Sequence, residues 1–415
     1  MARAVLKFGG TSVGDLERIA NVADIVAYRA ARGEHMAVVV SAMAGETNKL
    51  VAYAEGAAGP DLPRDQFHDE YDVIVASGEQ VTAGLLALAL RRRGLKARSW
   101  LGWQLRLKTD EDHGRARILG FDNSGLPDSV DRGEIAVVAG FQGVTDDDRV
   151  ATLGRGGSDT SAVAVAAALN ATVCDIYTDV DGVYTTDPRM VPKAQRIPKI
   201  SYEEMLEMAS LGAKVLQTRS VELAMNHNVP VRVLSSFLKP GEPNPGTLVC
   251  SEDEIVEKQV VSGVAYSRDE AKVTLYGVAD KPGVSAKIFS ALARAGVNVD
   301  MIVQANARGP EKANMVFTCT DRDSPIAKET LEKMSDDIGY DRLEVTRDVS
   351  KISIVGVGMK SHTGVAETMF TALYEKGINI DVISTSEIKI SVLIAAPYTE
   401  LAVRALHTAF GLDAV

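Results

Sequence analysis

An internal repeat in the C-terminal third is the feature that most constrains the fold of this 415-residue chain. A segment beginning at Lys272 (KVTLYGVADKPGVSAKIFSALARAGVNVDMIV) recurs in altered form from Lys351 (KISIVGVGMKSHTGVAETMFTALYEKGINIDVIS). Several positions are kept at a spacing of 81 residues: Gly283, Gly296, Asn298 and Asp300 match Gly364, Gly377, Asn379 and Asp381. Each copy predicts a strand, a glycine turn, an amphipathic helix and a second strand. A period this long excludes a solenoid and indicates two copies of one small βαβ-type module.

The N-terminal part of the chain, up to about residue 250, alternates short apolar runs with longer helical patterns. Buried strands are predicted at Ala4–Phe8, Met36–Ser41, Ile135–Ala139 and Thr172–Tyr177. Helices are predicted at Leu16–Arg32, Gln80–Arg93 and Ser161–Leu169. This alternation predicts an α/β domain with a mainly parallel central sheet. Ligands of such sheets bind beyond the carboxyl ends of the strands, so the loops at those ends are the informative ones.

Two glycine-rich loops have the composition of an anion site. In KFGGTS, which starts at Lys7, two glycines let backbone N–H groups face a phosphate beside the lysine charge. The loop Gly154–Thr160 (GRGGSDT) offers Arg155, free backbone donors and the start of a helix. A plainer explanation of the second loop stays open, because Ser158, Asp159 and Thr160 are all good helix N-caps. Neither loop has the residue order of a Walker A motif.

A third polar loop, YTDVDGVYTTDPR, follows the strand that ends at Tyr177. Its DxDG run is similar to the opening of an EF-hand, but Met190 stands at the twelfth position, where a calcium site needs glutamate. The sequence therefore argues against calcium. The polar acceptors, together with Tyr184 and Arg189, suit a nucleotide base and its phosphates instead.

Taken together, the motifs resemble the aspartokinases of the amino acid kinase superfamily. The resemblance rests on KFGGTS, SAM at Ser41, Thr47, SGEQ at Ser77–Gln80, AGFQG at Ala139–Gly143, GRGGSDTSA and YTDVDGVYTTDPR. It extends from Val5 through the repeat, whose copies resemble the paired ACT domains of that family. The similarity is to the short, monofunctional type with two C-terminal ACT domains.

This resemblance implies a three-layer, amino acid kinase-like domain with a mainly parallel sheet, followed by two α+β ACT-like domains of ferredoxin-like type. We place the catalytic domain at residues 1–248, a linker or extra regulatory strand at 249–266, and the ACT domains at 267–346 and 349–415. One departure is Thr363, which stands where relatives often have proline in the second glycine turn.

The resemblance also implies an activity: transfer of the ATP γ-phosphoryl group, with Mg²⁺, to the β-carboxylate of L-aspartate. The product is 4-phospho-L-aspartate, and its formation is the first step toward lysine, threonine and methionine. The implied catalytic residues are Lys7 and Asp159. Positions implied to hold aspartate are Ser41, Thr47, Glu79, Arg155 and Ser158. Positions implied to hold the nucleotide are Lys7, Gly9, Gly10, Ser12, Thr178, Asp179, Tyr184, Arg189 and Lys214. No residue is assigned as a metal ligand.

Relatives bind lysine, threonine or both between paired ACT domains, so feedback regulation by these amino acids is implied. The expected effector positions are Asp280, Asn298, Asp300, Gln304, Asn379, Thr385 and Ser386. An alternative is that one copy, above all the second, only supports a dimer. ACT domains usually dimerise, so we expect a homodimer through them or assembly with a regulatory subunit.

The chemistry of the reaction agrees with these residue types. The nucleophile, a carboxylate with a reference pKa of about 3.9, is already ionised at neutral pH and needs no general base. The difficulty is repulsion, since two like charges ~4 Å apart interact by about 4 kcal/mol at an effective dielectric of 20. Arg155 can hold the α-carboxylate through its planar fork, and Glu79 and Asp159 suit the α-ammonium.

Composition narrows the possible partners. The net charge of −11 and the pI near 5.2 argue against nucleic acid and against an anionic membrane. Three widely spaced cysteines without a CxxC pair favour reduced thiols and a cytoplasmic location. No run of residues approaches the ~18 consecutive apolar residues of a membrane span.

Two other functions are alternatives to an aspartate kinase. The first is another kinase of the superfamily, specific for glutamate or uridylate; Thr47, Glu79 and the tandem repeat argue against it. The second is a catalytically silent amino-acid sensor, which the intact Lys7, Arg155 and Asp159 oppose.

Overall fold

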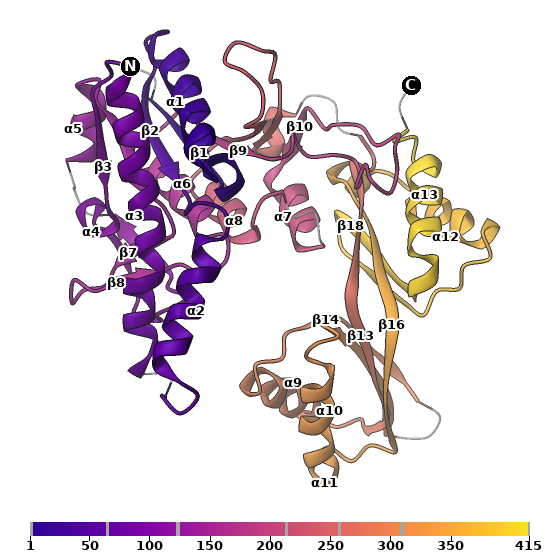
Figure 1. Ribbon diagram of the computed structural model, residues 1–415. Coiled ribbons are helices and arrows are strands. Elements are labelled where there is room, and N and C mark those ends of the chain that lie inside the picture. The colour runs from indigo at the N-terminus through magenta and orange to yellow at the C-terminus, as the bar shows by residue number, and fades with distance from the viewer. Residues whose placement is uncertain are drawn as a thin grey trace. The chain divides into compact units, whose positions relative to one another are not determined.

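The computed structural model describes residues 3–63, 66–121, 125–211, 215–255, 259–307 and 311–413. These residues form two compact units (Figure 1). The first contains residues 3–183, 196–210 and 215–255, and the second contains Tyr184–Gln195, Leu211 and residues 259–413. The first unit holds the predicted α/β domain and the second holds the repeat.

An eight-stranded sheet forms the centre of the first unit. Its order is β10 (Lys199–Ser201), β12 (Thr247–Cys250), β11 (Val231–Ser235), β9 (Val173–Thr178), β1 (Arg3–Phe8), β2 (His35–Val40), β6 (Ile135–Ala139) and β3 (Ala97–Trp100). Every neighbouring pair is parallel except β11 and β12. The predicted mainly parallel sheet is therefore confirmed.

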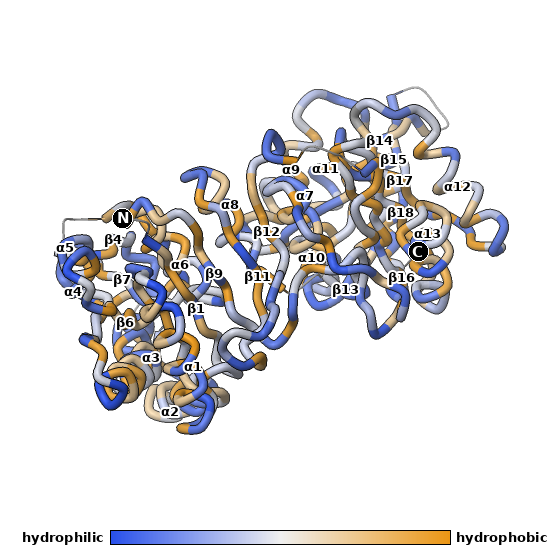
Figure 2. The backbone as a smooth tube through the Cα atoms, turned by 90° about the horizontal axis from the view of Figure 1, so that it is seen from above, coloured by the Kyte–Doolittle hydropathy of each residue, from blue (hydrophilic) through white to orange (hydrophobic). Residues whose placement is uncertain are grey.

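Helices cover both faces of this sheet. Helices α1 (Leu16–Ala30) and α3 (His68–Arg92) pack on one face, where Leu6, Phe8 and Val38 join their apolar side chains in one buried core. Helix α6 (Gly157–Ala168) packs on β1, β2 and β9, and α8 (Thr218–Asn226) packs on α6. Because side chains alternate along a strand, Lys7 lies on the opposite face from Leu6 and Phe8, beneath α6. Figure 2 shows the apolar residues gathered along the strands.

Two predicted helices have different starts from those expected. Helix α3 begins at His68 instead of Gln80, because Asp72 and Glu79 are buried polar residues that hide its apolar pattern. Helix α6 begins at Gly157, with Gly156 as its N-cap in the left-handed conformation. The predicted start is Ser161. Ser158, Asp159 and Thr160 thus lie inside the first turn, and the alternative that one of them is the N-cap is excluded.

The remaining elements of the first unit surround this core. Helix α2 (Glu46–Ala58) packs on α3, and a small sheet is formed by β5 (Ile118–Phe121), β4 (Leu107–Thr109), β7 (Gln142–Val144) and β8 (Val150–Thr152). The short helices are η1 (Gly10–Val13), α4 (Gly102–Leu105), α5 (Leu126–Asp131), α7 (Tyr202–Ser210) and η3 (Glu252–Glu254). By length and composition alone α3 passes the test for a membrane-crossing helix, as core helices of soluble proteins also do.

The second unit contains a six-stranded antiparallel sheet whose order mirrors the repeat. The order is β14 (Val299–Asn306), β15 (Lys312–Cys319), β13 (Gly263–Ala279), β16 (Arg342–Val355), β18 (Lys389–Ala395) and β17 (Val382–Thr385). The helices of the first copy are α9 (Val284–Arg294), α10 (Ser324–Lys333) and α11 (Ser335–Ile338). Those of the second are η4 (Val357–Ser361), α12 (Val365–Glu375), η5 (Ala396–Tyr398) and α13 (Thr399–Ala409). The two predicted α+β copies are confirmed.

One short segment leaves the first unit and packs into the second. Met190, Val191 and Ala194 join the buried core of the second repeat copy. The Thr185 hydroxyl lies 2.8 Å from Nε2 of His407 in α13, which is fully buried. The loop YTDVDGVYTTDPR is therefore divided between the two units at Val183.

Candidate active site

A buried ion pair lies at the carboxyl end of β1. The Nζ atom of Lys7 is 2.5 Å from Oδ1 of Asp159, and both residues are more than nine-tenths buried. Asp159 reaches this position because α6 starts close to the ends of β1 and β2. The two predicted catalytic residues are thus in direct contact. A buried charge is stable only when it is paired, so each of the two stabilises the other.

Glycines allow the loops around this pair to approach one another. A Cβ atom on Gly10 would lie 3.0 Å from the carbonyl oxygen of Ala42, and one on Gly9 would lie 3.3 Å from Nζ of Lys7. The backbone N–H of Ser41 donates to the carbonyl of Phe8 at 3.1 Å. The loops after β1 and β2 therefore lie against each other, with open backbone beside the lysine charge, as an anion site requires.

Glu79 is buried with half of its carboxylate unsatisfied. Its Oε1 atom accepts a hydrogen bond from the backbone N–H of Ala42 at 2.9 Å, whereas Oε2 has no partner among the residues that the structure describes. Burial raises the pKa of Glu79 to about 7, although the Ala42 N–H acts in the opposite direction. Gly78 brings the helix this close, since a Cβ there would lie 2.8 Å from Cβ of Ala42.

The first turn of α6 and the loop before it carry two of the other predicted aspartate residues, Ser158 and Arg155. Ser158 is buried beside Gly140, where a Cβ atom would lie 3.1 Å from the Ser158 hydroxyl and 3.0 Å from the Val40 carbonyl. Arg155 is exposed, and its guanidinium makes no hydrogen bond or ion pair with the described part of the chain. Thr47 is half-buried in the first turn of α2.

On the other side of Lys7, the structure connects the ends of β1, β9 and β11. The Ser12 hydroxyl donates to the hydroxyl of Ser236 at 2.8 Å, and the Ser236 N–H donates to the carbonyl of Thr178 at 2.9 Å. The Thr178 hydroxyl in turn donates to Oδ1 of Asp179 at 3.2 Å. These predicted nucleotide residues share one edge of the sheet with Lys7. The sequence analysis missed Ser236, for which the only signal was its place just after a strand.

Two other predicted nucleotide residues belong to the second unit, and a third lies outside the described residues. Tyr184 belongs to the second unit, where its ring packs against the core of the second repeat copy. Arg189 is also in that unit; its guanidinium pairs with Asp187 at 2.8 Å, and its side chain is 90% exposed. Lys214 lies outside the described residues. The nucleotide roles of these three residues stay predictions.

The predicted effector residues form two separate groups in the first repeat copy. Gln304 bridges two partners, since its side-chain amide donates to Asp280 at 3.5 Å and accepts from the Ser285 hydroxyl at 3.2 Å. Asp300 instead forms an ion pair with Lys351 of the second copy at 2.7 Å. Asn298 is exposed, as are Asn379, Thr385 and Ser386 in the second copy.

Comparisons with known proteins were made for the whole chain. Residues 2–235 match the Amino acid kinase family, and residues 272–339 and 352–410 each match an ACT domain family. The aspartate kinase of Pseudomonas fluorescens (strain SBW25) is 52% identical over 415 residues, which cover 100% of this chain and 98% of that protein. The aspartokinase of Mycobacterium tuberculosis (strain CDC 1551 / Oshkosh) is 44% identical over 416 residues, with 99% and 97% covered.

Solved structures are similar over nearly the same length. E. coli aspartokinase III in complex with aspartate and ADP, in the R-state, matches with a TM-score of 0.79 and 28% identity, covering 98% of this chain and 99% of that one. The same enzyme in complex with lysine and aspartate, in the T-state, matches with a TM-score of 0.76 and 29% identity over the same shares.

Proposed function

This chain belongs to the aspartokinase family, and from that premise we propose that it phosphorylates the β-carboxylate of L-aspartate with MgATP. In this reaction a β-carboxylate oxygen forms a bond to the γ-phosphorus, the bond from that phosphorus to the bridging oxygen of ADP breaks, and the products are 4-phospho-L-aspartate and ADP. The E. coli relative that binds aspartate and ADP supports the choice of both substrates.

The observation that carries this proposal is the unsatisfied carboxylate oxygen of Glu79. A buried acceptor without a partner costs free energy unless a ligand supplies a donor. The ammonium group of an amino acid supplies both a donor and a positive charge. Glu79 lies beside Ala42, whose carbonyl is next to Gly10 and the Lys7 loop, so an amino acid bound there has its side chain near the phosphate site. Arg155, whose guanidinium is exposed, can bind the α-carboxylate.

Lys7 and the glycine loop supply the charge that the reaction needs. Both reactants are anions, so the transition state gains most from fixed cations and backbone donors. Mg²⁺ would enter with ATP, held chiefly by phosphate oxygens and by one or two carboxylates. Within the described ranges no group of three or more His, Cys, Asp or Glu side chains is arranged as a metal site.

The ACT copies are proposed to sense lysine, threonine or both, and so to regulate the first step toward lysine, threonine and methionine. The lysine complex of the E. coli relative supports lysine as an effector. We also propose a homodimer through these domains or assembly with a regulatory subunit. A cytoplasmic location agrees with Cys174, Cys250 and Cys319, which are buried free thiols.

The test is an initial-rate assay of ADP release with MgATP and each candidate acceptor. We expect turnover with L-aspartate and at least 100-fold lower kcat/KM with L-glutamate or uridylate, and inhibition when lysine, threonine or both are added. Turnover with glutamate or uridylate in preference to aspartate would assign a different kinase. No turnover, together with tight lysine or threonine binding by calorimetry, would make the chain a sensor.

A further inference from the structure

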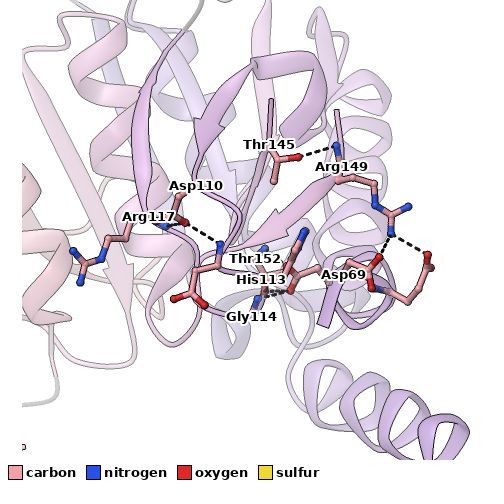
Figure 3. Close-up of polar contacts among 11 residues, drawn as sticks. Asp69, Asp110, His113, Gly114, Arg117, Thr145, Arg149 and Thr152 are labelled. Carbon is pink, nitrogen blue, oxygen red and sulfur yellow. Dashed lines mark hydrogen bonds and ion pairs between the residues drawn. The ribbon is translucent and has the colours of Figure 1, made fainter. Parts of the chain in front are cut away.

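A fully buried carboxylate outside the proposed site draws together three segments of the first unit. Asp72 lies in α3 with no exposed surface. It accepts hydrogen bonds from Nδ1 of His113 at 2.8 Å, from the N–H of Gly114 at 3.1 Å and from the N–H of Thr152 at 2.9 Å. The Thr152 hydroxyl is a fourth donor. Figure 3 shows His113, Gly114 and Thr152 converging at this point.

These donors belong to the segments that hold the loop around Arg155. Thr152 ends β8, and the chain passes from it through Leu153 and Gly154 directly to Arg155. A Cβ atom on Gly154, which has a φ of +74°, would lie 3.2 Å from the carbonyl of Gly114, so the His113–Gly114 turn lies against the loop. The backbone entering the Arg155 loop is therefore tied to Asp72 on both sides.

A second set of contacts fixes the next residue of the loop. The carbonyl of Leu153 accepts from the Arg219 guanidinium at 2.7 Å, and its N–H donates to the carbonyl of Phe141 at 2.9 Å. Arg219 also donates to the carbonyl of Ala116 in the His113 segment at 2.6 Å. Neither set includes the Arg155 side chain, so within the described part of the chain the backbone is held and the guanidinium has no partner.

The same helix carries both Asp72 and Glu79. Residues seven apart lie on one face of an α-helix, two turns or about 10 Å apart along the axis. Both carboxylates are buried on α3, one bound to Thr152 and the other to the N–H of Ala42. Helix α3 thus sets the distance between the Glu79 carboxylate and the start of the Arg155 loop.

We propose that Asp72, with His113 and Thr152, is a positioning group for the amino-acid substrate, because it holds the loop of Arg155 in register with Glu79. The inference rests on the proposed function, in which Arg155 binds the α-carboxylate and Glu79 the α-ammonium. A misplacement of about 1 Å in such a pair costs on the order of 10²-fold in rate. Among the residues that the structure describes, the hydrogen bonds of Asp72 go to His113, Gly114 and Thr152, and none goes to the predicted nucleotide residues Ser12, Thr178 and Asp179. A change at Asp72 should therefore affect the binding of aspartate and not that of ATP.

The test is Asp72→Asn in the full-length chain, with KM measured separately for aspartate and for MgATP. Asparagine is nearly the same size as aspartate, but its amide NH₂ group replaces one carboxylate oxygen. That group cannot accept the hydrogen bonds that the oxygen now accepts, so the contacts to His113, Gly114 and Thr152 are disturbed. We expect KM for aspartate to rise at least tenfold while KM for MgATP stays within twofold. A role in folding alone would lower the melting temperature without separating the two KM values.

The matched control is Asp69→Asn, one turn away on the same helix. Asp69 forms an ion pair with Arg149 at 3.2 Å, at the half-exposed surface, as Figure 3 also shows. Exposed pairs contribute little, so both KM values should stay within twofold of those of the unchanged chain. His113→Ala removes one of the four donors to Asp72 and should raise KM for aspartate at least threefold.

An aspartate KM within twofold of the unchanged chain in a folded Asp72→Asn protein would overturn the inference, as would an equal rise in both KM values. If Asp72→Asn does not fold, the same two outcomes are read from His113→Ala. A failure of the proposed function appears separately, as absence of aspartate turnover in the unchanged chain.

Discussion

Two buried carboxylates of the site lie in opposite electrostatic environments. Asp159 is 2.5 Å from the ammonium of Lys7, so its charge is compensated within the protein. Glu79 accepts a hydrogen bond from the backbone N–H of Ala42 and pairs with no cation among the described residues, and burial raises its pKa to about 7. Paired and unpaired carboxylates of this kind take different roles, since one is a fixed charge and the other a receptor for a cation.

The environment of Glu79 predicts how aspartate binding depends on pH. The substrate ammonium requires the ionised carboxylate, which is the minor form below a pKa of about 7. We therefore expect KM for aspartate to fall about tenfold per pH unit as the pH rises toward 7 and to level off above it. Glu79→Gln should raise KM for aspartate and remove this pH dependence, leaving the calorimetric affinity for ATP unchanged. Equal weakening of both ligands would contradict the assignment.

Lys7 is predicted to contribute to the reaction step itself. Lys7→Ala removes a preorganised cation from the phosphate site and leaves Asp159 buried without its partner. We expect kcat to fall by roughly 10²–10³, the scale for losing one such group. Lys333→Ala, which breaks an exposed ion pair with Glu329, is the control and should leave kcat unchanged. A loss below about threefold would remove Lys7 from the catalytic residues.

At the scale of elements, α3 contains two glycines, Gly78 and Gly84, that differ in the space around them. A Cβ on Gly78 would lie 2.8 Å from Cβ of Ala42 and 3.3 Å from Leu50, whereas one on Gly84 would meet nothing within 4 Å. Alanine favours a helix over glycine by about 1 kcal/mol where space allows. Gly78 is therefore required by a close approach, and Gly84 is not.

The same substitution at these two glycines should give opposite results. Gly84→Ala is expected to raise the free energy of unfolding by about 0.5–1 kcal/mol without changing kcat/KM. Gly78→Ala should displace Ala42 and the N–H that binds Glu79, and so raise KM for aspartate several-fold and lower the melting temperature. Urea titration and initial rates on both variants check this. A stabilised, fully active Gly78→Ala protein would show that the contact is not required.

The same helix shows what the sequence could and could not predict. Strand ends are readable, because the predicted ends lie within one residue of the observed ends of β1, β2, β6 and β9, and predicted site residues lie at or just after them. The start of α3 could not be predicted, because in the sequence Asp72 has the character of a surface residue. It is buried only because the fold brings His113 and Thr152 to it. The predicted effector residues Asp280 and Gln304 are likewise brought together across a turn and a strand.

At the scale of the whole chain, the sequence repeat becomes a symmetry of the second unit. Lys272 pairs with Asp381 at 2.7 Å, and Lys351 pairs with Asp300 at 2.7 Å, so each copy supplies a lysine to the other. The two aspartates are related by the 81-residue spacing, and each lysine is the first residue of its copy of the repeat. The sequence predicted two modules, but it did not show that β13 and β16 each run through both.

The docking of Tyr184–Gln195 into the second unit was equally hidden from the sequence. The YTDVDGVYTTDPR motif reads as one continuous loop, and nothing in its composition marks a change at Val183. Only the burial of Met190 and Val191 against the second repeat copy, with Thr185 beside His407, reveals the division. The core of the second unit thus includes part of the loop that follows β9 in the chain.

The two related ion pairs differ in burial, and that difference predicts different costs. Lys351 is 6% exposed and lies 3.0 Å from Glu270, itself 7% exposed, as well as next to Asp300. Lys351→Met should therefore strand a buried carboxylate and lower the stability of the full-length chain by about 3–5 kcal/mol. Lys272→Met, at a partly exposed pair, should cost about 1 kcal/mol or less.

The pH dependence of the Lys351→Met effect has a definite sign. Burial opposes ionisation of Asp300, but the Lys351 ammonium outweighs it and holds the pKa of Asp300 below its ordinary value. A lowered carboxylate pKa gives stability that is present above the ordinary value and is lost as pH falls through the lowered one. The difference in urea midpoint between the unchanged chain and Lys351→Met should thus be largest near neutral pH and shrink in acid. Equal shifts for Lys351→Met and Lys272→Met at every pH would show that burial does not distinguish the two copies, and that the internal symmetry extends to their energetics.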